Sequence, residues 1–205
     1  MGRKTNNVLK TQSQEITTID KKPGSDGLFP QKKTFIQPNI GLGIDVRKPV
    51  VEILNASLAN EAVLTQKTRN AHWNVSGKDF FELHILFETQ YKQLNEISDK
   101  LADRVRMLGG VAIAGFGEFL KHAQIKELSS TEIPDNIHLL ADHESVIRIM
   151  REDIRKCNEE YEDEGTVDLL VGVMSLHEKI AWMLRAYIEN GPTNGNGQKR
   201  KSKDE

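Results

Sequence analysis

The chain has 205 residues, of which 38% are hydrophobic and 28% are charged, and its formal net charge is −2 at pH 7. This composition is that of a globular domain with extensions, and no apolar run approaches the roughly 20 residues that a membrane-spanning helix needs. The start of the chain lacks an apolar signal segment, and the single cysteine, Cys157, excludes an intrachain disulfide framework. We therefore expect a cytoplasmic protein with no membrane partner, in which Cys157 is an unreactive thiol.

The charges are distributed unevenly along the chain. Residues 1–45 carry seven Lys and Arg against four Asp and Glu, and residues 191–205 carry four against two. The 17 Lys and Arg between them face 24 Asp and Glu, so residues 46–190 have a net charge of −7. Both ends are rich in Gly, Pro, Asn and Lys and cannot form a packed core. We expect a flexible basic extension over 1–45, a folded domain over 46–190 and a flexible basic tail over 191–205.

Four long helical patterns fill the domain, because apolar residues recur at steps of three and four. A short helix is expected in the loop between the second and third patterns, and no strand alternation is present. The expected helices span 47–74, 79–107, 118–122, 136–162 and 167–189. Four long helices joined in this order predict an all-α fold with a four-helix bundle.

Small and polar residues predict where these helices begin and end. Gly77 separates the first two helices, and Gly109 with Gly110 ends the second. Asp79 and Thr166 are candidate N-caps, because short polar side chains satisfy the free amide groups of a first turn.

Histidine and carboxylate residues form one stripe on the second long helix. With about 100° of rotation per residue, His84, Glu88, Asp99 and Asp103 fall within an arc of about 100°. The stripe is either an exposed polar face with local ion pairs or a metal site, because buried carboxylates are costly unless they are paired or bind metal. Glu88 and Asp99 are eleven residues and about 16 Å apart along the helix, so a single metal centre cannot contact both.

Either the two ends of the stripe are unrelated clusters, or a second copy of the chain completes each site across a two-fold axis. If the helix packs antiparallel against its own copy near residues 93–94, His84 and Glu88 of one chain approach Asp103 and Asp99 of the other, which makes two equivalent sites. Carboxylates with imidazole suit iron, manganese or zinc, and His72 lies just upstream. None of the six histidines has Glu three residues before it, which argues against the usual intrachain ferritin centre.

The residues around this stripe resemble a known family. The run Lys67 to Tyr91, KTRNAHWNVSGKDFFELHILFETQY, with DKLADRVRMLG from Asp99 and HEKIAWMLRAYIE in the last helix, is similar to the DNA-binding proteins from starved cells (Dps), the mini-ferritins. The resemblance covers about 47–190. It implies a ferritin-like four-helix bundle, a hollow homododecamer built from two-fold dimers, and a di-iron centre that oxidises Fe(II), commonly with hydrogen peroxide, and stores ferric mineral.

The resemblance also assigns the ligands. His72, His84 and Glu88 match those from one subunit, and Asp99 and Asp103 match those from its two-fold partner. Zinc or manganese are expected substitutes for iron. Position 103 is often Glu in the family, so the shorter Asp puts one metal contact in doubt. Trp73 matches an aromatic residue beside the centre, where it either packs or takes part in redox chemistry.

Three further groups of residues carry open alternatives. Asp163 and Asp168 match acidic pore residues of the family, or they serve only a helix N-terminus. The tail residues contact DNA or merely keep the protein in solution; they are Lys199, Arg200, Lys201 and Lys203. The other histidines have no ligand spacing and are expected at the surface or in packing; they are His122, His138, His143 and His177.

Two functions therefore follow from the sequence. The first is a ferroxidase and iron-storage protein that protects against oxidative damage. The alternative is a DNA-binding structural protein that compacts the nucleoid and has minor iron chemistry.

Overall fold

The fold consists of five α-helices and one short 3-10 helix in the described part of the chain. The computed structural model describes residues 25–28, 36–129 and 131–190, and it has no strand in those ranges. The elements are η1 (Ser25–Leu28), α1 (Ile44–Asn74), α2 (Phe80–Met107), α3 (Phe116–His122), α4 (Asn136–Glu159) and α5 (Glu164–Asn190). The predicted all-α fold, with a short helix between the second and third long helices, is confirmed.

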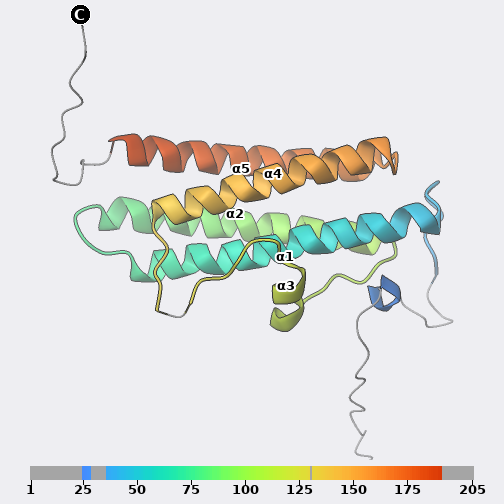
Figure 1. The fold of residues 1–205 in the computed structure, drawn as a ribbon, viewed down its shortest axis with the longest axis horizontal. Coiled ribbons are helices and arrows are strands. Elements are labelled where there is room, and N and C mark those ends of the chain that lie inside the picture. Colours follow the sequence, from blue (N-terminus) through green and yellow to red (C-terminus); the bar gives the residue numbers. More distant parts are fainter. Residues whose placement is uncertain (1–24, 29–35, 130, 191–205) are drawn as a thin grey trace, which may run out of the picture.

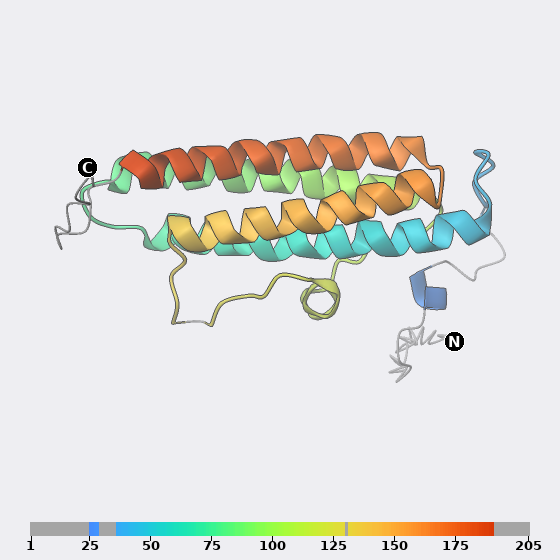
Figure 2. The same ribbon diagram turned by 45° about the horizontal axis from the view of Figure 1, so that its top comes forward.

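The four long helices pack as two antiparallel hairpins. α1 packs along α2 and α4 packs along α5, and the hairpins meet through α1 against α4 and α2 against α5 (Figure 1). The long connection from α2 to α4 lies outside the bundle and carries α3 beside α1 (Figure 2). This connection brings α4 alongside α1. Each long helix therefore contributes one apolar face to a common core.

α2 ends where the glycine pair predicts. Gly109 has φ +83°, a left-handed conformation that suits glycine. The Gly109 amide donates to the Arg106 carbonyl oxygen and the Gly110 amide donates to the Val105 carbonyl oxygen, both at 3.0 Å. This pair of bonds is the Schellman motif, which satisfies carbonyl groups that the helix end leaves free.

The start of α5 differs from the prediction. The helix begins at Glu164, and Thr166 lies inside its first turn. Asp163 is the capping residue, since its Oδ1 accepts the Thr166 amide at 3.1 Å and its Oδ2 accepts the Thr166 hydroxyl at 2.7 Å. Asp79 does occupy the N-cap position of α2, but its side chain makes no capping hydrogen bond there.

The core lies between the two hairpins along the length of the bundle. Its fully buried side chains come from all four long helices and include Leu54, Leu64, Phe87, Leu101, Leu139 and Leu184. Burial of apolar area on this scale is the main driving force for folding. None of the helices in the described residues has the length and apolar character to cross a membrane.

Candidate metal centre

Two histidines face each other where α1 passes into α2. The His72 and His84 rings are stacked with their centroids 3.8 Å apart. His72 Nδ1 lies 2.8 Å from the His84 carbonyl oxygen, and His84 Nδ1 lies 3.0 Å from the His72 carbonyl oxygen. Because a carbonyl oxygen only accepts, each Nδ1 carries the proton. The Nε2 of each ring therefore holds the lone pair that a metal ion needs.

Aromatic neighbours restrain both imidazole rings. The Phe80 ring stacks on His84 at 5.1 Å between centroids, and the Tyr91 ring meets His72 edge-on at 5.4 Å. The Arg69 guanidinium lies 5.2 Å above Tyr91. Rings held by stacking and by backbone hydrogen bonds lose little further freedom when they bind a metal.

Glu88 lies one turn after His84 on α2. Its Oε1 accepts a hydrogen bond from Lys92 Nζ at 2.6 Å. That hydrogen bond and the Lys92 charge lower the pKa of Glu88 below its ordinary value of 4.5, and His72 and His84 contribute in the same direction. Glu88 is therefore anionic at neutral pH, and the Lys92 ammonium lies beside its carboxylate.

Asp99 and Asp103 are exposed on the same helix, one turn apart. The fold does not bring them to His72, His84 or Glu88 within one chain. No three His, Cys, Asp or Glu side chains of the described residues form a ready metal site in a single chain. Each chain thus presents two separate half-sets of candidate ligands, and both their metal binding and their union across a two-fold axis stay predictions.

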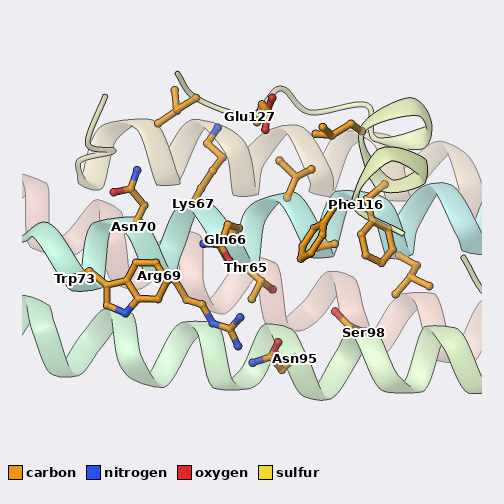
Figure 3. Close-up of a pocket in the computed structure, with 16 residues that line it drawn as sticks. Thr65, Gln66, Lys67, Arg69, Asn70, Trp73, Asn95, Ser98, Phe116 and Glu127 are labelled. Atoms are coloured by element: carbon orange, nitrogen blue, oxygen red, sulfur yellow. The ribbon is translucent and has the colours of Figure 1, made fainter. Parts of the chain in front are cut away.

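The surface around the stripe is apolar and hollowed. Trp73 and Phe81 are 64% and 72% exposed, although they are large apolar side chains. A cavity of about 690 Å³ lies between α1, α2 and α3, and Trp73, Arg69, Asn95, Ser98 and Phe116 are among its lining (Figure 3). Asn95 and Ser98 lie about 20° and 40° either side of the His84 direction on α2. The cavity and the stripe therefore share one face.

Comparisons with known proteins place this geometry in a family. The ferritin-like domain matches residues 51–193. The DNA protection during starvation protein 2 of Bacillus anthracis is 34% identical over 145 residues, which are 70% of this chain and 99% of that protein. An uncharacterised low temperature-induced protein of Nostoc sp. (strain PCC 7120) is 42% identical over 163 residues, which are 78% and 90% of the two chains.

The chain belongs to the Dps family of ferritin-like proteins. Its fold matches the Dps protein of Vibrio cholerae O1 with a TM-score of 0.70 and 33% identity, over 77% of this chain and 99% of that one. That protein is described as a member of a broad superfamily of ferritin-like diiron-carboxylate proteins. DpsC of Streptomyces coelicolor matches with a TM-score of 0.72 and 27% identity, over 78% and 95%.

Asp163 and Asp168 take different positions in this Dps chain. The Asp163 side chain is 2% exposed and accepts from Arg104 Nη2 at 2.6 Å as well as from Thr166. It therefore has the local role at a helix N-terminus and an ion pair with the partly buried Arg104, and its assignment to a pore stays a prediction. Asp168 is exposed, and its assignment to a pore stays a prediction. The four tail residues predicted to contact DNA lie outside the described residues.

Two histidines that the sequence assigned to the surface or to packing are fully buried in this Dps bundle. His143 of α4 and His177 of α5 are both 0% exposed and are joined through their Nδ1 atoms. Their partners come from other helices, so no spacing within one helix pattern marks them.

Proposed function

We propose that this protein binds Fe(II) at a di-iron centre shared by two chains, oxidises it, and stores the ferric product inside a hollow homododecamer in the cytoplasm. The observation that carries the proposal is the reciprocal bonding of His72 and His84. It leaves two imidazole Nε2 atoms beside the Glu88 carboxylate, a donor set that suits iron and also zinc or manganese.

The partner chain supplies Asp99 and Asp103. A two-fold axis near residues 93–94 aligns the half-set of one chain with that of the other, and it produces two centres because the half-sets are about 16 Å apart. The exposed Trp73 and Phe81 side chains and the cavity beside them support a partner on this face. Large apolar surfaces of this kind are typical of an interface.

The side chains explain the expected reaction. The carboxylates favour Fe(III) over Fe(II) by their charge, while the neutral imidazoles fix the position of the ion through Nε2. Two Fe(II) ions supply the two electrons that reduce one hydrogen peroxide molecule to water, so no hydroxyl radical is released. The centre thereby removes Fe(II) and hydrogen peroxide, the two reactants that form hydroxyl radical, and protects against oxidative damage.

Peroxide-driven Fe(II) oxidation by the purified protein tests this function. Replacing His84 and Glu88 together by Ala should reduce the rate to that of free Fe(II), while the assembled shell persists in size-exclusion chromatography. A matched variant, His138→Ala with Glu189→Ala, changes one exposed His and one exposed Glu away from the stripe and should oxidise at the wild-type rate. Wild-type oxidation by the His84 and Glu88 variant would show that the site is assigned wrongly.

DNA binding is a second candidate function, and the charge distribution favours it. The basic residues of 1–45 and 191–205 flank an acidic domain, and a dodecamer would multiply weak phosphate contacts. A gel-shift series against salt should show DNA retardation by the full chain that weakens when either end is deleted. If the full chain fails to retard DNA even at low salt, nucleoid compaction is excluded.

A further inference from the structure

A second cluster of ligand-type side chains lies inside the bundle. Glu61 of α1, His143 of α4 and His177 of α5 are each 0% exposed. Glu61 Oε1 lies 2.9 Å from His177 Nε2, and His177 Nδ1 lies 2.9 Å from His143 Nδ1. None of these residues belongs to the stripe on α2, and all three belong to one chain.

The hydrogen bonds of this cluster do not satisfy its own atoms. His177 donates its Nε2 proton to Glu61, and one proton is shared between the two Nδ1 atoms. Whichever ring holds that shared proton, Glu61 Oε2 and His143 Nε2 have no hydrogen-bond partner among the described residues. A buried carboxylate oxygen without a partner is costly, and a cation near the carboxylate compensates its charge.

Two further buried polar side chains come from α1 and α2. The Thr65 hydroxyl and the Gln90 side-chain amide are buried and also have no partner among the described residues. Thr65 lies one turn after Glu61, on the same face of α1. Gln90 lies thirteen residues after Gly77 and Thr65 twelve before it, so the antiparallel packing of α1 and α2 puts both at one height.

We propose that His143 and His177, with Glu61 orienting the His177 ring, form a second cation site, for a divalent transition metal ion, at the centre of the bundle. Imidazole with carboxylate suits Zn²⁺, Fe²⁺ or Co²⁺. The 2.9 Å between the two Nδ1 atoms is near the spacing of about 3 Å that neighbouring ligands take on one metal with bonds of about 2.1 Å. The positive ion compensates the Glu61 charge, which no described cation faces at hydrogen-bond distance.

The observed row of side chains is the empty form of this site. The three side chains bind one another in a line, so metal binding replaces the contact between the Nδ1 atoms by two nitrogen–metal bonds. A neutral imidazole carries its proton on either nitrogen, and the His143 proton then resides on Nε2. Glu61 keeps its hydrogen bond to His177 and orients that ring, as carboxylates commonly do behind metal-bound histidines.

Co²⁺ binding to the full chain tests the site, and the inference does not rest on the proposed ferroxidase. The starting protein carries His84→Ala, Glu88→Ala, Asp99→Ala and Asp103→Ala, which removes the four ligands of the stripe. Equilibrium dialysis should then find one Co²⁺ per chain, with visible absorption bands of nitrogen-ligated Co²⁺. Adding His177→Asn should abolish this binding, and adding Glu61→Gln should weaken it about 10- to 100-fold, the range for residues that orient metal ligands.

The controls separate this site from surface binding and from misfolding. Adding His138→Asn, on the exposed face of α4, should leave the bound Co²⁺ unchanged. Co²⁺ should raise the melting temperature of the starting protein and should raise it much less in the near-isosteric Glu61→Gln protein, which serves if His177→Asn does not fold. Absence of bound Co²⁺ in the starting protein overturns the proposal, and so does binding that survives both Glu61→Gln and His177→Asn.

Discussion

His72 and His84 hold each other in place through the backbone, because each ring donates its Nδ1 proton to the carbonyl oxygen of the other residue. The His72 carbonyl lies in the last turn of α1, where helix carbonyls lack intrahelical partners. The same bond therefore joins two helices and sets the tautomer of a candidate metal ligand. Local stability and metal binding are linked at this pair.

This linkage predicts that His84→Phe loses both stability and iron oxidation. Phenylalanine retains the stacking on His72 and Phe80 but has no nitrogen, so the His72 carbonyl loses its side-chain donor. The free energy of unfolding should fall by about 1 kcal/mol, the usual value of one hydrogen bond, and iron oxidation should be lost. His84→Asn offers a nitrogen near the position of Nδ1 but lacks Nε2, so it should also lose oxidation. Unchanged stability of His84→Phe in urea unfolding would show that the His72 carbonyl has another donor.

The ion pair between Lys92 and Glu88 predicts that Lys92→Met strengthens iron binding. The ammonium competes with a metal ion for the Glu88 oxygen at 2.6 Å. At pH 7 the Glu88 carboxylate is ionised with or without Lys92. Removing the Lys92 ammonium should therefore lower the Fe(II) concentration for half-maximal oxidation by roughly two- to five-fold, the range for an exposed ion pair. Lys179→Met, at an exposed position of α5, is the control, and an equal effect there would indicate a general charge effect.

The same pair predicts an acid dependence. The lowered pKa of Glu88 means that its folded value lies below the unfolded one. The ion pair therefore contributes to stability above about pH 4.5, the ordinary value, and this contribution is lost as the pH falls through the folded pKa. The wild type should therefore melt above Lys92→Met at pH 6, and this difference between the two proteins should shrink as the pH falls to 3. A difference that stays constant over this range would show that the pair of Lys92 and Glu88 does not cause it.

Asp103→Glu should improve the proposed centre. Glutamate is longer than aspartate by one methylene group, and it is the residue that is common at this position in the Dps family. We expect faster peroxide-driven oxidation at limiting iron, whereas Asp103→Asn, which removes the charge, should slow it. Stopped-flow absorbance of the ferric product measures both, and a slower rate for Asp103→Glu would mean that the interface requires the shorter side chain.

The sequence predicted the helices better than their contacts. The end of α2 depends on a left-handed glycine, which is a local signal, and the prediction held. The start of α5 depends on Asp163, whose partner Arg104 lies 59 residues away, and periodicity carries no information about such a pair. For the same reason, helix periodicity grouped His84 and Glu88 on one face but could not assemble Glu61 with His177, which are 116 residues apart.

The buried pair of Arg104 and Asp163 predicts a large destabilisation for Arg104→Met. The Asp163 side chain is 2% exposed and the Arg104 side chain 18%, so the variant leaves an unpaired carboxylate in the interior. Breaking a fully buried pair typically costs about 3–5 kcal/mol, and the hydrogen bonds that Asp163 keeps from Thr166 put the expected loss near the low end of that range. Arg155→Met removes an arginine from an exposed pair with Glu152 and should cost less than about 1 kcal/mol. Equal losses for the two variants in urea unfolding would contradict the structural role of Arg104.

Two glycines predict opposite effects of the same substitution. Gly109 has φ +83°, and a Cβ there would lie 2.9 Å from Arg47 Nη1 and from Pro38 Cδ. Gly109→Ala should therefore lower stability by at least about 1–2 kcal/mol, the cost of the left-handed conformation for alanine. Gly172 lies within α5, and a Cβ there meets nothing within 4 Å, so Gly172→Ala should raise stability by up to about 1 kcal/mol through helix propensity. The melting temperatures of the two variants, measured at equal protein concentration, should shift in opposite directions. A shift in the same direction would mean that assembly contacts, and not the local backbone, decide the effect at one of the two glycines.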